Sequence, residues 1–537
     1  MLASCNRTWA ALAMTCALLL PLALCGCGAA DPDGRASARG KVALATNPLA
    51  PGATAPAAPA SAPAAAQGPR ATKRPNIVFV LTDDLAWNLV PYMPHVLAME
   101  RHGETFANYF VTDSLCCPSR ASIFSGRFPH NTQVTSNSPP YGGFSVFHER
   151  GEEQHTFATA LQRVGYRTAM MGKYLNGYQP GGEDANGVLQ PSSPQPPGWN
   201  EWDVAGNGYS EFGYRLNENG RTGTYGFQSQ EYLTDVLARK GMNFIDQAAL
   251  AHRPFLLELA TFAPHSPFTP APRDEQDFPG LTAPRTPAFD AADAAAPAWL
   301  SHFAPLEPQQ LEQIDTQFRL RAQAVQAVDN MIALIEAELR ARGEAKNTYL
   351  VFSSDNGLHM GEHRLMPGKQ TAFDTDIRVP LIVAGPGVPP GRTVPEMSEN
   401  VDLCPTFERL AGAPVGSNVD GHSLVELLHH QPPHEAWRRE ILVEHHGPVL
   451  GPTDPDLPTR GAGNPSSYEA LRTPTSLYVE YVTGEREYYN LRTDPFELRN
   501  LAAHLSLAHA QRLHRALVAI EACRGRRSCW RAQHLPT

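Results

Sequence analysis

The run Asn76-Ile-Val-Phe-Val-Leu81 is followed directly by Thr82-Asp83-Asp84. Its continuous apolar character suits a strand that is covered on both faces, as in the parallel sheet of an α/β protein. Ligands of such sheets collect beyond the carboxyl ends of the strands, which is where Asp83 and Asp84 would lie. Because adjacent acidic residues are also common in solvated turns, this pair alone leaves both interpretations open.

A second predicted strand ends in the same kind of polar turn. Thr348-Tyr-Leu-Val-Phe-Ser-Ser354 precedes Asp355-Asn356-Gly357. Ahead of it, apolar residues spaced three and four apart from Val325 to Leu339 predict a helix that closes at Gly343. The two turns together offer hard oxygen ligands, which suit calcium or magnesium better than zinc. The predicted ligands are Asp83, Asp84, Asp355 and Asn356.

The stretch Leu115-Cys-Cys-Pro-Ser-Arg-Ala-Ser-Ile-Phe-Ser-Gly-Arg127 lies between these strands. Pro118 has a preset φ and no amide hydrogen, so it suits the first turn of a helix. Cys116 would then lie just outside a helix N-terminus, where unpaired amides favour an anionic group. Arg120 can offer a planar fork of donors to the same oxyanion. For a bare Cys-Cys, a buried or disulfide-bonded pair is the alternative, and Cys117 receives no role.

This stretch resembles the pattern Cys-x-Pro-Ser-Arg, a short helix and Thr/Ser-Gly that marks formylglycine-dependent (type I) sulfatases of the alkaline phosphatase superfamily. The resemblance implies that a formylglycine-generating enzyme oxidises Cys116 to 3-oxoalanine, whose hydrate is the nucleophile and contacts the metal. It also implies an α/β fold with a large, mostly parallel sheet sandwiched by helices. A smaller C-terminal antiparallel sheet would carry a helix at about Leu505 to Cys523.

Three further segments match the same family in the expected order along the chain. Gly172-Lys173 implies that Lys173 contacts the sulfate, and Pro264-His265 implies that His265 helps to protonate the leaving group. Pro367-Gly368-Lys369 carries a second Lys near the leaving oxygen. Taken singly, each Lys is more typical of a solvated surface. The implied catalytic set is Cys116, Arg120, Lys173, His265 and Lys369, and the implied metal set is Asp83, Asp84, Cys116, Asp355 and Asn356, around one Ca²⁺ or Mg²⁺.

One departure from the family pattern concerns the base that deprotonates the hydrate. Many relatives place a His shortly after the Gly-Lys pair, whereas this chain has Leu175 and Asn176. An Asn side chain accepts a hydrogen bond but cannot act as a base near neutral pH. His130, ten residues beyond Arg120, is a candidate substitute, and an exposed turn His is the alternative.

Several phrases make the resemblance closest to the N-acetylglucosamine-6-sulfatase branch and similar bacterial arylsulfatases. They are Cys-Cys-Pro-Ser-Arg-Ala-Ser, Gly-Lys-Tyr-Leu-Asn, Tyr232–Ala238, Ala263–Phe268, Val379–Val383 and Tyr488–Glu497. The expected activity is hydrolysis of sulfate monoesters, on sulfated sugars such as N-acetylglucosamine 6-sulfate or on aryl sulfates. Phosphonate or phosphate monoester hydrolysis is an alternative within the superfamily, and a non-catalytic sulfoglycan-binding lipoprotein is an alternative outside enzymes.

The leaving-group side is expected to be shaped by three loops: Tyr178–Trp202, Pro270–Pro305 and Pro452–Ser467. They interleave aromatic and polar residues, a mixture that suits stacking on a sugar face and bonding its hydroxyls. The alternative is that the aromatic residues pin long loops to the protein. The residues are Trp199, Trp202, Phe278, Trp299, Asn186 and Asn200.

The N-terminal region predicts export. Residues 1–27 place Arg7 ahead of an apolar run and end in Leu24-Cys25-Gly26-Cys27, which resembles a lipoprotein cleavage box with Cys27 as the lipidated residue. A plain secretory signal is the alternative. The protein would be periplasmic, at the cell surface or secreted, with membrane attachment only through a lipid anchor. Residues 28–74, rich in Ala and Pro, predict a disordered linker.

The remaining predictions concern organisation and charge. We expect a catalytic domain at 75–435 and a small C-terminal subdomain at 436–537, with short strands at 439–444, 476–481 and 487–491. Cys523 and Cys529 would form a local disulfide in an oxidising compartment, with two free thiols as the alternative. Cys404 is expected to be a buried thiol. The net charge of -10 argues against a nucleic-acid partner, so local positive charge must draw a sulfated substrate.

Overall fold

The computed structural model describes residues 73–183, 188–449, 454 and 456–534. The expected signal segment 1–27 with Cys27, and all but the last two residues of the expected linker 28–74, lie outside the described residues. Within the part of the chain that the structure describes, no helix is long and apolar enough to cross a membrane. The expected division at residue 435 stays a prediction.

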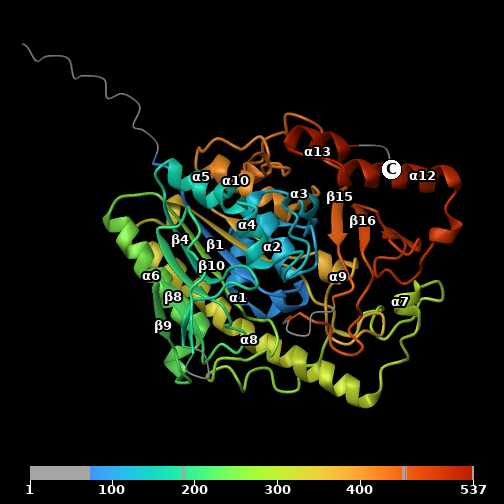
Figure 1. Ribbon diagram of the computed structural model, residues 1–537, viewed down its shortest axis with the longest axis horizontal. Coiled ribbons are helices and arrows are strands. Elements are labelled where there is room, and N and C mark those ends of the chain that lie inside the picture. Colours follow the sequence, from blue (N-terminus) through green and yellow to red (C-terminus); the bar gives the residue numbers. More distant parts are fainter. Residues whose placement is uncertain (1–72, 184–187, 450–453, 455, 535–537) are drawn as a thin grey trace, which may run out of the picture. The chain divides into compact units, whose positions relative to one another are not determined.

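A ten-stranded sheet forms the centre of the fold (Figure 1). Its middle strands are parallel neighbours, and antiparallel strands flank them on both sides, so the expected large, mostly parallel sheet is confirmed. In spatial order the strands are β13 (Arg392–Val394), β2 (Glu104–Phe106), β12 (Leu381–Ala384), β11 (Thr348–Ser354), β1 (Asn76–Thr82), β10 (Phe255–Ala260), β4 (Arg167–Lys173), β7 (Glu201–Ala205), β8 (Arg215–Glu218) and β9 (Arg221–Thr224).

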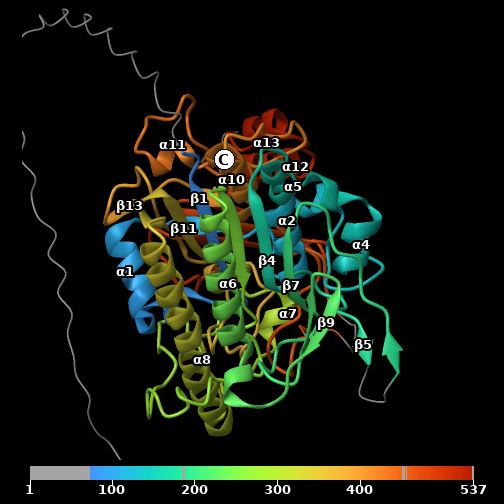
Figure 2. The same cartoon turned by 90° about the vertical axis from the view of Figure 1, so that its left-hand side faces the viewer.

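Strand β1 shows why its sequence is apolar throughout. Ile77 and Phe79 face one hydrophobic core and Val78 and Val80 face the other, since successive side chains of a strand point to opposite faces. Helices α1 (Pro94–His102), α6 (Leu233–Leu250) and α8 (Pro308–Ala341) cover one face, with α6 and α8 adjacent in Figure 2. Helices α2 (Cys116–Ser125), α4 (Gly143–Glu149), α5 (Phe157–Arg163) and α10 (Leu403–Leu410) cover the other.

Helix α8 is longer than the sequence pattern around Val325 indicates. It begins at Pro308, and Glu307 and Gln310 form a capping box at its N-terminus. Proline suits this first position because its missing amide hydrogen would have no intrahelical partner there. The additional turns carry Arg321, which is fully buried under the strand ends.

The C-terminal antiparallel sheet is also confirmed, with four strands instead of the three predicted. They are β15 (Ile441–His445), β16 (Tyr468–Thr473), β17 (Ser476–Tyr481) and β18 (Arg486–Asn490). One face joins the main core through Val443 and Val479, and the other packs Leu471 against Leu517 of α12 (Leu507–Glu521). A disulfide between Cys523 and Cys529 connects α12 to α13 (Arg526–Ala532).

The remaining strands and α-helices are short. They are β3 (Tyr109–Phe110) paired with β14 (Ser398–Glu399), β5 (Gly182–Glu183) paired with β6 (Leu189–Gln190), α3 (Pro129–Thr132), α7 (Ala298–Ser301), α9 (Asp374–Ile377) and α11 (Val425–Leu428). Cys404, on α10, is a free and fully buried thiol, as expected.

Candidate active site

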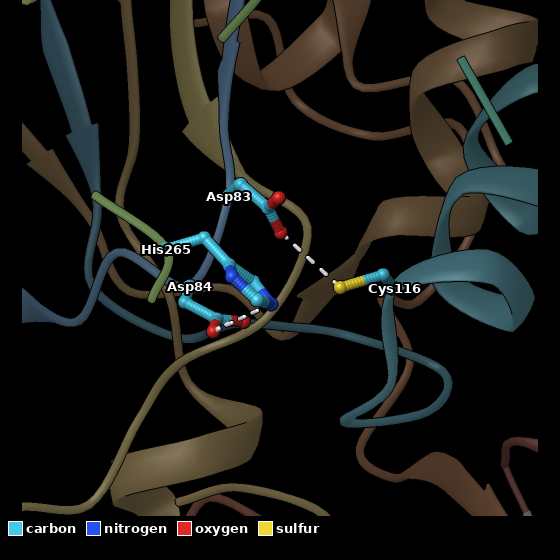
Figure 3. Close-up of side chains that lie close together, drawn as sticks. All are labelled: Asp83, Asp84, Cys116 and His265. Carbon is cyan, nitrogen blue, oxygen red and sulfur yellow. Dashed lines mark hydrogen bonds and ion pairs between the residues drawn. The ribbon is translucent and has the colours of Figure 1, made fainter. Parts of the chain in front are cut away.

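Polar residues from several elements meet at the carboxyl ends of the central strands. Asp83 and Asp84 follow β1, Asp355 follows β11, and Lys173 is the last residue of β4. Asp84 has a φ of 63°, a left-handed conformation that Asp tolerates better than most residues and that turns the chain directly after the strand. Figure 3 shows Asp83, Asp84, Cys116 and His265 pointing toward one another.

Cys116 is the first residue of α2, with Leu115 as its N-cap, so it lies inside the helix and not just before it as expected. Its thiol is fully buried and lies 3.2 Å from Asp83 Oδ1. Burial raises the pKa of Cys116 well above its ordinary value, and the carboxylates of Asp355, Asp456 and Asp83 raise the pKa further. The unmodified side chain is therefore a neutral thiol, which is a poor nucleophile.

Two buried lysines neutralise the acidic pair after β1. Lys173 Nζ lies 2.5 Å from Asp83 Oδ2, and Lys369 Nζ lies 2.6 Å from Asp84 Oδ1 and 2.9 Å from Cys116 Sγ. Burial disfavours both ammonium groups, but Asp83 beside Lys173 and Asp456 and Asp84 beside Lys369 hold their pKa values well above the ordinary range. Both lysines are thus cations, Lys173 at the end of β4 beside Asp83 and Lys369 beside Cys116.

Arg120 and Asp355 form a fully buried ion pair with 2.7 Å between Nε and Oδ2. Burial raises the pKa of Asp355, but Arg120, Lys173 and Lys369 outweigh it and bring that pKa to about 2. Arg120 also donates from Nη1 to the Lys173 carbonyl, which ties α2 to the end of β4. Its Nη2 is buried without a partner among the described residues, so one donor of the guanidinium is left for another acceptor.

The oxygen donors of the site, the carboxylates of Asp83 and Asp84 and the amide oxygen of Asn356, fit a hard divalent cation. One ligand atom each of Asp83, Asp84, Cys116 and His265 lies within 4.8 Å of the others. Asn356 adds a buried Oδ1 that has no partner among the described residues. Burial raises the pKa of Asp83, so a cation there would stabilise its charged form. His265 was not among the ligands predicted from the sequence.

His265 is held between acidic groups. Its Nδ1 lies 2.7 Å from the Ser266 carbonyl, and its Nε2 lies 2.7 Å from Asp456 Oδ1 and 3.6 Å from Asp84 Oδ2. Burial lowers the pKa of His265, but Asp84, Asp83 and Asp456 outweigh burial and raise it above the ordinary value. The raised pKa favours the protonated ring, with Nε2 directed at Asp456 and Asp84.

Three residues of this site were not predicted. Asp456, in the loop Pro452–Ser467, accepts bonds from both His265 and Lys369, the latter at 2.6 Å. Arg321 donates to the Asp84 carbonyl from α8, and the Tyr209 ring lies 4.5 Å from the His265 ring. Asp456 belongs to no recognisable sequence motif. The apolar pattern near Arg321 predicts a helix but gives no indication that this residue reaches the site.

The structure contradicts the hypothesis that His130 is the base. Its Nδ1 lies 2.9 Å from the Glu444 carboxylate and its Nε2 lies 3.0 Å from the Cys523 carbonyl, so both ring nitrogens face the C-terminal region. Asn176 does lie near the site, where its amide is 3.4 Å from the Tyr209 hydroxyl.

Comparisons with known proteins agree with this geometry. The sulfatase family matches residues 75–413, and the C-terminal region of N-sulphoglucosamine sulphohydrolase matches residues 361–522. N-acetylglucosamine-6-sulfatase of Homo sapiens is 33% identical over 481 residues, which is 84% of this chain and 86% of that protein. Arylsulfatase of Volvox carteri is 31% identical over 86% of this chain and 77% of that protein. The chain belongs to the sulfatase family and is a sulfuric ester hydrolase.

Solved structures share the fold. A structure of BT4656 in complex with its substrate D-glucosamine-2-N,6-O-disulfate superposes with a TM-score of 0.68 and 22% identity over 83% of this chain and 97% of that one. A phosphonate monoester hydrolase from Silicibacter pomeroyi superposes with a TM-score of 0.62 and 24% identity over 82% and 93% of the two chains. At these identities the likeness concerns the fold alone.

Proposed function

We propose that this sulfatase removes sulfate from sulfated amino sugars, with N-acetylglucosamine 6-sulfate as the preferred type of substrate. The observation that carries this proposal is the meeting of Cys116, Lys173, His265 and Lys369 around a buried carboxylate cluster, in a chain whose relatives include N-acetylglucosamine-6-sulfatases. Such a site offers cations to a tetrahedral anion and an acid to a departing alcohol.

Cys116 is the residue that would be oxidised to formylglycine by a maturation enzyme, and its hydrate would supply the nucleophilic oxygen. Asp83, Asp84, Asp355 and Asn356 would hold a divalent cation, calcium or magnesium, which when bound neutralises charge on the sulfate oxygens. Lys369 lies against Cys116 and Lys173 against Asp83, so both ammonium groups are placed to bind and orient the sulfate oxygens.

His265 is the residue best placed to protonate the leaving oxygen. Its Nε2 faces the carboxylate of Asp456, and the ammonium group of Lys369 is bonded to the same carboxylate. Either His265 or Lys369 can therefore deliver a proton to a leaving oxygen beside Asp456. Arg120 acts through Asp355, whose carboxylate it holds in place, and offers its unpaired Nη2.

The space next to this site suits a sugar better than a small aryl group. A cavity of about 110 Å³ is lined by Asp84, His265, Lys369 and Asp456, and it adjoins a cleft of about 1040 Å³ through the shared residues Pro458 and Thr459. The cleft combines an aromatic ring with polar and charged groups. Its lining includes Trp299, His302, Gln310, Arg364, Arg460 and Asn464.

Of the aromatic residues expected to face the sugar, only Trp299 lines this cleft. Trp202 lies on β7 and is fully buried, and Trp199 packs beside it at 6.2 Å between ring centroids, so the prediction was wrong for both. Phe278 packs on Tyr92, Asn200 bonds Thr168, and Asn186 lies outside the described residues.

The test is kcat/KM of the matured enzyme for N-acetylglucosamine 6-sulfate, an activated aryl sulfate and a phosphonate monoester. We expect the sugar sulfate to be turned over and the phosphonate to be the poorest substrate. Turnover of aryl sulfates without any turnover of the sugar sulfate would overturn the assignment. Preference for the phosphonate would instead support the second candidate, which the phosphonate hydrolase fold matches favour.

We also propose that the protein is exported. A disulfide between Cys523 and Cys529 is typical of a protein that folds in an oxidising compartment. We infer a periplasmic or cell-surface location, with Cys27 as the lipid attachment site. Mass analysis of the mature N-terminus tests this inference, because a lipidated Cys27 at the N-terminus is expected, and cleavage elsewhere without lipid would contradict it.

A further inference from the structure

Helix α13 forms one wall of a basic groove that shares no lining residue with the catalytic cavity. Two adjoining hollows of about 370 and 400 Å³ meet there and have Glu435, Arg527 and Trp530 in common. We call this surface the arginine groove. Its basic lining residues are four arginines, Arg409, Arg526, Arg527 and Arg531, and two histidines, His434 and His534.

The arginine groove is built on a rigid base. Trp530 is 9% exposed, and its ring stacks on His422 at 3.9 Å and contacts Trp437 at 5.3 Å. The disulfide of Cys523 and Cys529 closes the turn that leads into α13. The exposed guanidinium groups of Arg526 and Arg527 therefore project from a fixed backbone.

Two acidic residues, Glu426 and Glu435, line the groove beside four arginines, so its positive charge is only partly offset. Glu426 is buried and already pairs with Arg409 and His434, whereas no described carboxylate forms an ion pair with Arg526, Arg527 or Arg531. The chain as a whole has more acidic than basic residues, so this concentration of arginine does not reflect composition. Guanidinium groups bind sulfate through paired, charge-assisted hydrogen bonds.

The electric field of the positive charges of the groove acts on the neighbouring side chain of His422. Burial lowers the pKa of His422, and Arg438, Arg526 and Arg409 lower it further, to about 3. His422 is thus a neutral ring under a positive surface. The same field would attract an anionic ligand from solution, and salt would screen that attraction.

We propose that the arginine groove is a second binding site that holds a sulfated polysaccharide chain apart from the reaction centre. The identity of the polymer rests on the proposed function. A sulfatase that acts on chain ends benefits when the remainder of the chain stays bound. Tethering would raise the effective concentration of each new chain end at the catalytic cavity.

The first experiment measures binding of a size-defined heparin oligosaccharide to the full chain in a Cys116→Ala background, which prevents turnover. The groove variant carries the three substitutions Arg526→Gln, Arg527→Gln and Arg531→Gln. The control variant has the same change in charge at exposed arginines elsewhere on the protein, Arg150→Gln, Arg221→Gln and Arg492→Gln. We expect Kd to rise roughly tenfold or more for the groove variant and to change less than about twofold for the control. The single variant Arg527→Gln, whose residue lines both hollows, should give the largest single loss.

Equal weakening in both triple variants would overturn the proposal, because binding would then follow net charge alone. So would equal affinity for single-stranded DNA of matched charge or for the desulfated oligosaccharide. The second experiment compares turnover by the matured enzyme of a sulfated polymer and of N-acetylglucosamine 6-sulfate. The groove variant should lower kcat/KM for the polymer only, and an unchanged value for the polymer would contradict the tethering role.

These measurements separate the two proposals. If N-acetylglucosamine 6-sulfate is not turned over but heparin binding is still lost only in the groove variant, the proposed substrate fails and the arginine groove stands. If the sugar sulfate is turned over while both triple variants bind heparin like the parent protein, the groove proposal fails and the substrate assignment stands.

Discussion

Cys116 combines full burial with a neutral thiol, so its chemistry depends on conversion to another group. We predict that Cys116→Ala abolishes sulfatase turnover and leaves the fold intact, because the substitution removes one sulfur atom and little packing. The measurement is turnover of the purified variant together with its thermal unfolding curve. Retention of even a tenth of the parent activity would contradict a covalent mechanism at this residue.

Cys117→Ala is the matched control at the next position. Cys117 is also fully buried but belongs to the hydrophobic core under α2. Its truncation should cost about 1 kcal/mol of stability and leave kcat/KM nearly unchanged. Loss of turnover in this variant would show that the site depends on the packing of the helix and would weaken the assignment to Cys116.

The carboxylates after β1 and β11 are predicted to carry the metal. Asp83→Asn keeps the size of the side chain but removes a charge that faces both Lys173 and Cys116. We expect a loss of about a hundredfold or more in turnover, with reduced bound metal. Elemental analysis of the parent protein should give calcium or magnesium, and stoichiometric zinc in their place would contradict the ligand argument.

At the scale of single elements, strand β10 places a carboxyl group in the core. Glu258 is fully buried, and neither oxygen of its carboxyl group has a partner among the described residues. Burial raises the pKa of Glu258 from 4.5 to about 8, although Arg120 lowers it. Because the folded state favours the protonated form, stability is fully present below about pH 4.5 and decreases as pH rises to about 8.

Glu258→Gln should therefore remove this pH dependence. We expect the variant to melt at a higher temperature than the parent protein near pH 9, and the difference to shrink toward about pH 5. Glu344→Gln, three residues beyond the end of α8, is a control at a carboxylate that already pairs with Lys73. A melting temperature of Glu258→Gln that stays below that of the parent at both pH values would contradict a protonated Glu258.

Helices and strands with a clear hydrophobic pattern could be predicted from the sequence. The other elements depend on tertiary contacts that the sequence pattern does not show. β1 and β11 were predicted because a strand covered on both faces must be apolar throughout. β16 was missed because it directly follows a loop rich in Pro and Gly and gave no separate strand signal.

The same distinction applies to the site residues. Cys116, Lys173 and Lys369 lie in motifs and meet in the structure. Asp456 has no motif, because its position depends on how a long loop folds over the cavity. Trp202 shows the opposite error, since aromatic residues near loops do not reveal whether they face solvent or core.

At the scale of the whole molecule, the C-terminal sheet and the large sheet share one hydrophobic core. Val443 and Val479 belong to the same buried cluster as Phe79 of β1. The loop between β15 and β16 also delivers Asp456 to His265 and Lys369. The expected subdomain from residue 436 onward is thus coupled to the catalytic part through both packing and the active site.

We therefore predict that the catalytic part and the C-terminal part unfold together. Thermal unfolding followed by near-ultraviolet circular dichroism and by loss of turnover should give coincident transitions, because removing the C-terminal sheet would expose the apolar face that it covers. A chain that ends at residue 435 should be insoluble or lack a cooperative transition. Two separate transitions, or a folded and active chain ending at residue 435, would show that the C-terminal part is an independent domain.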